Sequence, residues 1–341
     1  MKIVKNIILL VLIVFVIASV YLATLDGSYD VSRTRRIKAD PEVVFNDLND
    51  YRNWKDWGPW YEQDSTILVQ YADNTIGEGG AYTWTSDIEG GGSIKTVEIN
   101  KPDQIKQEII FETPFGDMKS DIYWNLKKVE SDTELTWGMK GELPFFSRFM
   151  ASGMEDQLGP MQERGLELFD ENIQRKLKIY SIDSIGVVDF SGGFYLYLTT
   201  SSKIDQMNPK LAEMMEEIEK FISKNRIRVT GNPYTIYHKF DQENGTTMFS
   251  VAYPVQERII TTDSDILTGF MDRGTYHKTI LKGSYNNLEE AWQKAMFDAA
   301  NLKEHTMQDS GEPFEIYVNS PDNTLDPSKL ITEIYVPVQI R

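Results

Sequence analysis

GNPYTIY at residues 231–237 and GEPFEIY at residues 311–317 share the pattern G-x-P-aromatic-x-I-Y and lie 80 residues apart. A second pair of stretches, SVAYPV at 250–255 and EIYVPV at 333–338, recurs at an offset of 83 residues. Each stretch is predicted to be a β-strand, because β-branched and aromatic residues dominate it. The similar offsets predict that the C-terminal part of the chain contains one structural unit twice.

A helical segment precedes each pair of strands. Apolar residues recur at helical spacing at residues 209–222 and again at 288–300. The repeated unit is therefore predicted to be a strand, a helix and two strands, a β-α-β-β unit that is used twice around a pseudo-twofold axis. Ligands often bind where two related halves meet, so a binding site is expected near this axis.

The N-terminal segment predicts a membrane anchor. Residues 6–25, NIILLVLIVFVIASVYLATL, contain no charge, and a helix of this length spans roughly 30 Å, the thickness of the hydrocarbon core of a bilayer. The apolar run is longer than that of a secretory signal, and it ends without a clean cleavage site. We therefore expect residues 1–26 to form an uncleaved transmembrane anchor.

The charges around this segment favour different orientations. Lys2 and Lys5 precede it and Asp26 follows it, which favours a cytoplasmic N-terminus with the remaining chain outside. Basic residues at positions 33–38 lie near its other end and favour the opposite arrangement. We expect a single-pass membrane protein with its soluble part outside the cytoplasm, and the opposite orientation stays open.

Residues 27–178 have the pattern of an antiparallel sheet followed by one long helix. An alternating strand at 29–37 leads into a helix capped by Asp40, with Pro41 in its first turn. Strand-like segments separated by Gly, Asn and Asp follow, and an apolar helical pattern occupies residues 152–178. This order predicts an α+β fold in which a curved sheet is wrapped around the C-terminal helix.

This first domain resembles the START-like helix-grip superfamily, also called SRPBCC or polyketide cyclase/dehydrase-like. The resemblance rests on the order of elements and on the text IKADPEVVFNDLNDYRNWKDWGPW at residues 37–60. It implies a cavity for an apolar ligand between the sheet and the helix. Trp54, Trp57 and Trp60 either pack in the core, rim this cavity or lie at a lipid interface, where tryptophan is enriched.

The second domain, residues 179–341, resembles the GyrI-like domain, the effector-binding module of AraC-type and multidrug-responsive transcription activators. The resemblance rests on KGSYNNLEEAWQKAM at 282–296, EPFEIYVNSP at 312–321 and KLITEIYVPV at 329–338. It implies a cleft, lined by aromatic residues and carboxylates, that binds small cationic or aromatic molecules. A membrane anchor and a helix-grip domain stand here in place of a DNA-binding domain, so the role in transcription is not inherited.

Comparison of the two repeats indicates the candidate ligand-binding carboxylates. Glu315 takes the place of a threonine in the first repeat, and Glu333 that of a serine, so neither acid is required by the fold. Alternation along a strand puts Glu315 with Tyr317, and Glu333 with Tyr335. We expect these four residues in one anionic, aromatic-walled pocket, and the resemblance implies that both acids match the family's cleft acids. A solvent-exposed position on each strand is the alternative.

Further candidates line the same expected cleft. Tyr195 and Tyr197 alternate in GGFYLYL, and Trp292 lies on an alanine-rich helix face; packing roles for all three stay open. His277 is the lone histidine just ahead of the 282–296 block, and we expect it at the surface. No nucleophile, general base or other catalytic residue is predicted from any motif.

Composition excludes several classes of function. Lys and Arg total 35 against 52 Asp and Glu, and this net charge of −17 has the wrong sign for neutralising phosphates, so we expect no nucleic-acid partner. The chain has no cysteine and only three widely spaced histidines, so we expect no metal and no cofactor. The sequence identifies no protein partner.

Three functions therefore stay open. The first is a membrane-tethered protein that binds a cationic or aromatic small molecule in the GyrI-like cleft. The second is a hydrolase or detoxifying enzyme that acts on reactive small molecules with Glu and Tyr in the same cleft. The third is a carrier of lipid or polyketide-like ligands that uses the helix-grip domain.

Overall fold

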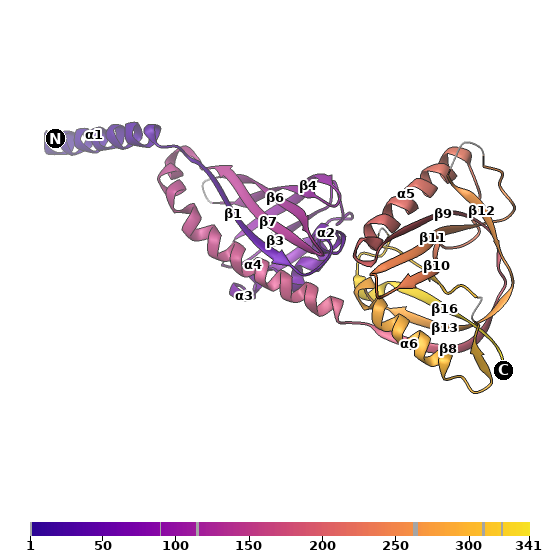
Figure 1. Ribbon diagram of the computed structural model, residues 1–341. Coiled ribbons are helices and arrows are strands. Elements are labelled where there is room, and N and C mark those ends of the chain that lie inside the picture. Colours follow the sequence, from indigo (N-terminus) through magenta and orange to yellow (C-terminus); the bar gives the residue numbers. More distant parts are fainter. Residues whose placement is uncertain (1, 89, 114–115, 262–264, 309–310, 322) are drawn as a thin grey trace. The chain divides into compact units, whose positions relative to one another are not determined.

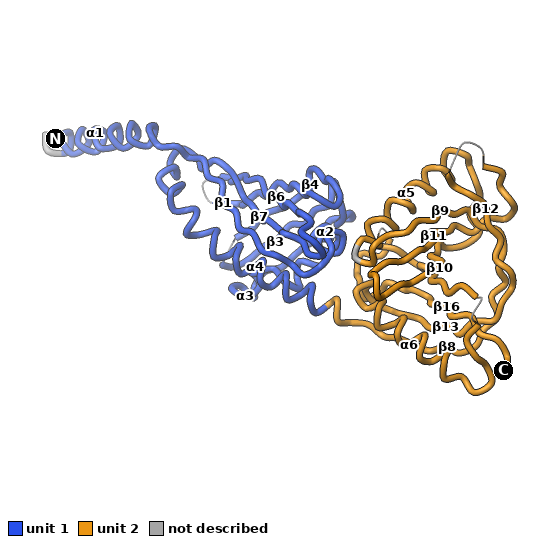
Figure 2. Tube along the Cα trace, in the orientation of Figure 1, with its two compact units in different colours: residues 1–175 blue, residues 176–341 orange. Residues whose placement is uncertain are grey.

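A computed structural model describes residues 2–88, 90–113, 116–261, 265–308, 311–321 and 323–341. The chain forms two compact units, residues 1–175 and residues 176–341. Figure 2 shows the two units in different colours, and each is described by itself.

The chain begins with helix α1 (Lys2–Thr24). Its segment Val4–Thr24 has a mean hydropathy of 3.0 over the most apolar stretch, and that stretch is not buried against the rest of the protein. By length and composition this helix could cross a membrane or serve as a signal sequence. An apolar N-terminal helix was predicted, and the structure confirms it at this coarse level.

Seven strands of the described part of unit 1 form an antiparallel sheet in the order β1-β7-β6-β5-β4-β3-β2. The strands are β1 (Ser28–Ile37), β2 (Leu68–Tyr71), β3 (Ala81–Thr85), β4 (Gly91–Asn100), β5 (Gln104–Glu112), β6 (Met118–Val129) and β7 (Asp132–Glu142). The helices are α2 (Pro41–Asn49), η1 (Tyr51–Asp56), α3 (Trp60–Gln63), η2 (Phe145–Gly153) and α4 (Met154–Leu177). As predicted, the Asp40 side chain caps α2 by accepting a hydrogen bond from the Glu42 amide, and Pro41 opens the helix.

Aromatic side chains fill the space between this sheet and α4. Trp57 packs edge-on against Phe169 of α4, with ring centroids 5.1 Å apart, and Trp124 stacks on Trp137 at 4.7 Å. Trp54 and Trp57 are each only 2% exposed. Trp54 and Trp57 therefore pack in the core, which was one of the three expected alternatives, because their large apolar surface is removed from water there. Trp60 is half-buried and contacts both of them.

Unit 2 contains a nine-stranded sheet in its described residues, with the order β12-β9-β11-β10-β15-β16-β13-β8 and with β14 paired to β16 (Figure 1). The strands are β8 (Ser181–Phe190), β9 (Gly193–Lys203), β10 (Tyr234–Asp241), β11 (Thr246–Val255), β12 (Leu267–Met271), β13 (Gly274–Lys282), β14 (His305–Met307), β15 (Phe314–Tyr317) and β16 (Ile331–Ile340). The helices are η3 (Ile204–Gln206), α5 (Met207–Asn225), η4 (Tyr285–Asn287), α6 (Leu288–Ala300) and η5 (Pro327–Lys329).

The strand order shows the repeat that the sequence predicts. β9, α5, β10 and β11 form one unit, and β13, α6, β15 and β16 form the other, in mirrored order about the β10–β15 contact. At this contact Thr235 pairs with its repeat equivalent Glu315, while Tyr234 pairs with Ile316. The two repeated strands therefore meet on the local twofold axis.

Both long helices of unit 2 pack on one face of the sheet, which we call the helix face. α5 buries Met214 and Ile218 against β9 and β11, and α6 buries alanines such as Ala295 against β13 and β16. The strand register links the two regions, because Val251, Thr235, Glu315 and Ile334 are successive cross-strand partners. Directly paired residues of antiparallel strands project to the same side.

A candidate ligand-binding face on the second sheet

The opposite face of this sheet gathers aromatic side chains, and we call it the aromatic face. Its buried members are Tyr234, Ile236, Ala252, Tyr276, Phe314 and Tyr335, and the half-buried members include Phe190, Tyr195, Tyr197 and Ile316. They come from strands of both repeats, and neighbours across the sheet point to the same side because the register pairs them directly.

The centre of the aromatic face is a stack of two rings. Phe314 and Tyr335 are direct cross-strand partners, with ring centroids 4.7 Å apart and planes only 9° from parallel. Tyr276 meets Phe314 edge-on at 5.1 Å, and Phe190 lies 4.9 Å from the same ring. Such contacts hold the rings in fixed orientations, and the two stacked rings are buried, with Phe314 at 0% and Tyr335 at 6% exposure.

A lysine and a glutamate pair beside this stack. Lys278 Nζ lies 2.8 Å from Glu333 Oε1 and 5.3 Å from the centroid of the Tyr335 ring. The Tyr335 hydroxyl donates a hydrogen bond of 2.7 Å to Glu333 Oε2. Both charged side chains are about four-fifths buried, at 19% and 21% exposure. A cation therefore already lies over an aromatic ring and against a carboxylate, the arrangement of a cation–π site.

Tyr195 and Tyr197 lie on the same face, as the sequence places them together. Their rings are 5.4 Å apart, and Tyr195 meets Tyr234 edge-on at 5.8 Å. Burial, with the Glu312 carboxylate and Tyr197 as lesser causes, raises the pKa of Tyr195 to about 12. This phenol stays protonated at neutral pH and can donate a hydrogen bond to a ligand.

Glu315 belongs to the helix face. It is 1% exposed, and it accepts hydrogen bonds from Tyr317 Oη at 2.6 Å, Trp292 Nε1 at 2.6 Å and Tyr237 Oη at 3.1 Å. Burial raises the pKa of Glu315, and these donors oppose that shift because they stabilise the carboxylate. Trp292 reaches this carboxylate from α6.

The structure does not bring the two predicted carboxylates together. Glu315 pairs with Ile334 and Glu333 pairs with Ile316, so the two acids project to opposite faces of the sheet. The expected pocket with both acids is therefore corrected to two separate clusters. Glu333 and Tyr335 lie on the aromatic face, and Glu315 and Tyr317 lie beneath the helices. The predicted pairing within each strand holds, since each tyrosine hydroxyl donates to its own glutamate.

A chain of polar side chains that the sequence did not predict lies at one side of the aromatic face. Glu312 Oε1 lies 2.6 Å from His238 Nδ1, and His238 Nε2 lies 2.6 Å from Ser250 Oγ. Ser250 in turn lies 2.7 Å from Thr199 Oγ1. This connectivity resembles an acid–base–nucleophile series, but Ser250 is 1% exposed and its hydroxyl is shared with Thr199. We therefore assign the chain a structural role. His238 lies at a β-bulge, which no sequence pattern predicts.

The expectation that His277 is a surface residue is wrong. His277 pairs with Val336 on the helix face and is 1% exposed, with Nε2 3.1 Å from Ser184 Oγ. Burial lowers its pKa, so the ring is neutral in the folded protein at pH 7. An alternating strand has one buried face, and the sequence alone did not show which face that is.

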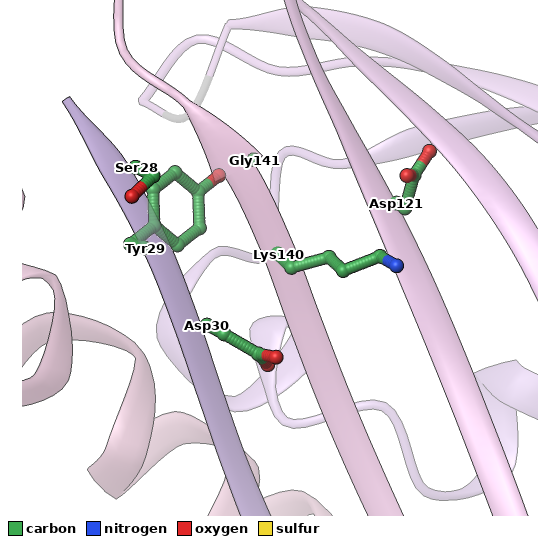
Figure 3. A pocket seen from close by; sticks show the side chains of 6 residues that line it. All are labelled: Ser28, Tyr29, Asp30, Asp121, Lys140 and Gly141. Carbon is green, nitrogen blue, oxygen red and sulfur yellow. The ribbon is translucent and has the colours of Figure 1, made fainter.

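Unit 1 contains an open surface pocket of different character. It is lined by Ser28, Tyr29, Asp30, Asp121, Lys140 and Gly141. Figure 3 shows Lys140 between Asp30 and Asp121, which are its cross-strand partners on β1 and β6. This polar surface pocket differs from the apolar internal cavity that the helix-grip resemblance implies. Among the residues that the structure describes, no group of acidic and histidine side chains is arranged to hold a metal ion.

Residues 194–339 match the family model of the GyrI-like small molecule binding domain. This segment is a GyrI-like domain. Its match confirms the resemblance predicted for the second half of the chain. No curated protein matches the chain.

Solved structures resemble parts of the chain at low identity. The EcmrR C-terminal domain is 15% identical, with a TM-score of 0.39, and the match covers 48% of this chain and 99% of that one. The EcmrR–DNA complex is also 15% identical, with a TM-score of 0.41 and coverages of 57% and 70%. Protein CV1439 from Chromobacterium violaceum is 14% identical, with a TM-score of 0.33 and coverages of 42% and 96%.

The GyrI-like domain thus presents two chemically different carboxylates. Glu333 is partly accessible and is paired with Lys278. Glu315 is enclosed and is satisfied by donors from β10, β15 and α6.

Proposed function

We propose that the GyrI-like domain binds a cationic or aromatic small molecule on its aromatic face. The observation that supports this proposal best is the position of Lys278, whose ammonium group lies against Glu333 and above the Tyr335 ring. A ligand cation can take the same position, because the carboxylate and the ring attract any positive charge placed there.

The aromatic residues around this position supply the apolar part of the site. Phe314 and Tyr335 form a flat, buried platform. An aromatic ligand gains contact area and quadrupolar attraction from the half-buried rings around it. Tyr195 and Tyr197, from the other repeat, extend the platform and offer hydroxyl groups. In this proposal Glu333, Tyr335, Tyr195 and Tyr197 contact the ligand.

The remaining predicted residues support the sheet from behind. Glu315, Tyr317 and Trp292 form one hydrogen-bonded cluster on the helix face. We propose that this cluster fixes α6 against β15, which carries Phe314 of the platform. Substitution there is expected to change stability more than ligand chemistry.

The remaining parts of the chain are assigned by composition and element order. We propose that residues 1–26 anchor the protein in a membrane, that residues 27–178 form a START-like helix-grip domain, and that residues 179–341 carry the binding domain outside the cytoplasm. The apolar helix α1 supports the first assignment, and the antiparallel sheet followed by α4 supports the second.

Calorimetric titration of the full chain in detergent with benzyltrimethylammonium tests the proposed site. This probe combines a quaternary cation with one aromatic ring. We expect saturable binding that Glu333→Gln weakens by about tenfold, because one charge contact is lost. The matched control is Glu289→Gln, which neutralises an exposed acid on α6. Equal affinity in both variants and the parent protein would place the ligand elsewhere.

A further inference from the structure

A cluster of exposed apolar side chains lies on η2 of unit 1. Phe145, Phe146, Phe149 and Met150, which we call the Phe patch, occur within this nine-residue helix. Phe146 is 64% exposed and Phe149 is 60% exposed. Single exposed apolar residues are ordinary on protein surfaces, but four of them on one short segment indicate an interaction surface.

The Phe patch adjoins the end of the apolar helix α1. α1 ends at Thr24, and three residues later the Gly27 carbonyl accepts a hydrogen bond from the Leu143 amide, just ahead of η2. α1 and η2 are themselves in contact. A side chain at Gly27 would collide with Arg148 of η2, since its Cβ would lie 2.8 Å from the arginine Cγ. The surface of η2 therefore begins where α1 ends.

Arg148 contacts both Phe145 of the Phe patch and the carboxylate of Glu142. Its guanidinium group lies 5.7 Å above the Phe145 ring and pairs with Glu142 at 2.9 Å. Arginine and aromatic residues together are typical of the boundary between headgroups and hydrocarbon, because both have an apolar body and a polar end. The 3₁₀ hydrogen bonds of η2 satisfy part of its backbone N–H and C=O groups, which lowers the free-energy cost of bringing this helix close to lipid.

We propose that the Phe patch inserts into the lipid surface next to the anchor, so that unit 1 is docked on the bilayer as well as tethered to it. This inference rests on the proposed membrane attachment through α1. The bilayer is the occupant because the apolar helix α1, which carries no charge from Asn6 onward, ends beside the patch. The apolar phase that covers α1 then extends to η2. Docking restricts the motion of unit 1 relative to the membrane.

The natural absence of cysteine makes a labelling test direct. Single cysteines are placed in the full chain by Phe146→Cys and Phe149→Cys, and each is labelled with an environment-sensitive nitrobenzoxadiazole dye. Phe15→Cys reports on the anchor, and Leu68→Cys, at a residue 72% exposed on edge strand β2, is the matched control. The proteins are reconstituted into phosphatidylcholine–phosphatidylglycerol vesicles with or without nitroxide-labelled lipid.

We expect nitroxide lipid to remove most of the dye fluorescence at positions 146, 149 and 15 and little at position 68. Phe146→Glu is expected to reduce quenching of a dye at position 149. Iodide, which quenches from water, is the second quencher. Quenching by nitroxide lipid at position 15 but not at positions 146 and 149, where iodide quenches instead, overturns docking and leaves the tether intact. Protection of 146 and 149 from both quenchers means that protein covers the patch, which also overturns the proposal. Loss of quenching at 15 overturns the tether, and docking with it.

Discussion

Replacement of Lys278 by methionine is expected to tighten binding of a monovalent cation to the aromatic face. In the free protein the ammonium group of Lys278 occupies the position proposed for the ligand, 2.8 Å from Glu333 and 5.3 Å from the Tyr335 ring centroid. A cationic ligand must displace this group before it can bind. Methionine keeps the length and the apolar stem of lysine and removes the charge.

The size of the effect follows from what the displaced lysine loses. The ion pair is about four-fifths buried, so we take its value as about 1 kcal/mol, at the upper end for accessible pairs. The contact with the Tyr335 ring adds roughly 0.5 kcal/mol. The sum of about 1.5 kcal/mol corresponds to an approximately tenfold lower Kd for the cation.

Calorimetry with benzyltrimethylammonium and with neutral toluene-sized aromatics measures this effect. Lys278→Met should improve the Kd of the cation about tenfold and change that of a neutral ligand little. Lys282→Met, which removes a charge from an exposed position on the same strand and face, is the control for net charge. Weaker cation binding in Lys278→Met would refute competition by the lysine.

Further predictions concern the helix face and use urea unfolding of the full chain in detergent. The pKa of Glu315 is raised, so its contribution to stability is fully present at pH values below the usual glutamate range and is lost as pH rises through the folded pKa. Glu315→Gln should remove this decline. Identical pH profiles of the unfolding free energy for both proteins would contradict this prediction. Trp292→Phe removes the 2.6 Å bond to that carboxylate and should cost about 1.5–3 kcal/mol, whereas a loss near zero would show that the bond contributes nothing. The pKa of His277 is lowered, so its contribution to stability is fully present at pH values above the usual histidine range and is lost as pH falls through the folded pKa. His277→Leu should flatten the pH profile of the unfolding free energy between about pH 7 and pH 5. An unchanged slope would exclude this histidine as the cause of the decline.

The elements of this protein could be predicted well where the signal is local. The cap at Asp40, the long helix up to Leu177 and the helix that begins at Leu288 all follow from residues close in the sequence. The repeat could also be predicted, because its two copies keep the same aromatic and β-branched residues at nearly constant offset. The strand order then places the copies symmetrically.

The separation of Glu315 and Glu333 onto opposite faces could not be predicted, because it depends on the register between strands. Alternation within β15 and within β16 correctly groups each glutamate with its tyrosine. Which residue of β15 faces which residue of β16 is set by long-range pairing, and a shift by one residue would reverse the faces. Lys278 carried a usable signal, since a lysine two residues after Tyr276 on a strand places a charge on the same face as that tyrosine.

The central claim is that ligand binds on the aromatic face and not beneath the helices. Photo-crosslinking with a diazirine derivative of benzyltrimethylammonium, followed by peptide mapping, tests it most directly. We expect adducts on aromatic-face residues such as Tyr335, Tyr276 and Tyr195, and their suppression by excess unlabelled probe. Suppressible adducts confined to Trp292, Tyr237 and Tyr317 would refute binding on the aromatic face and would place the ligand at Glu315.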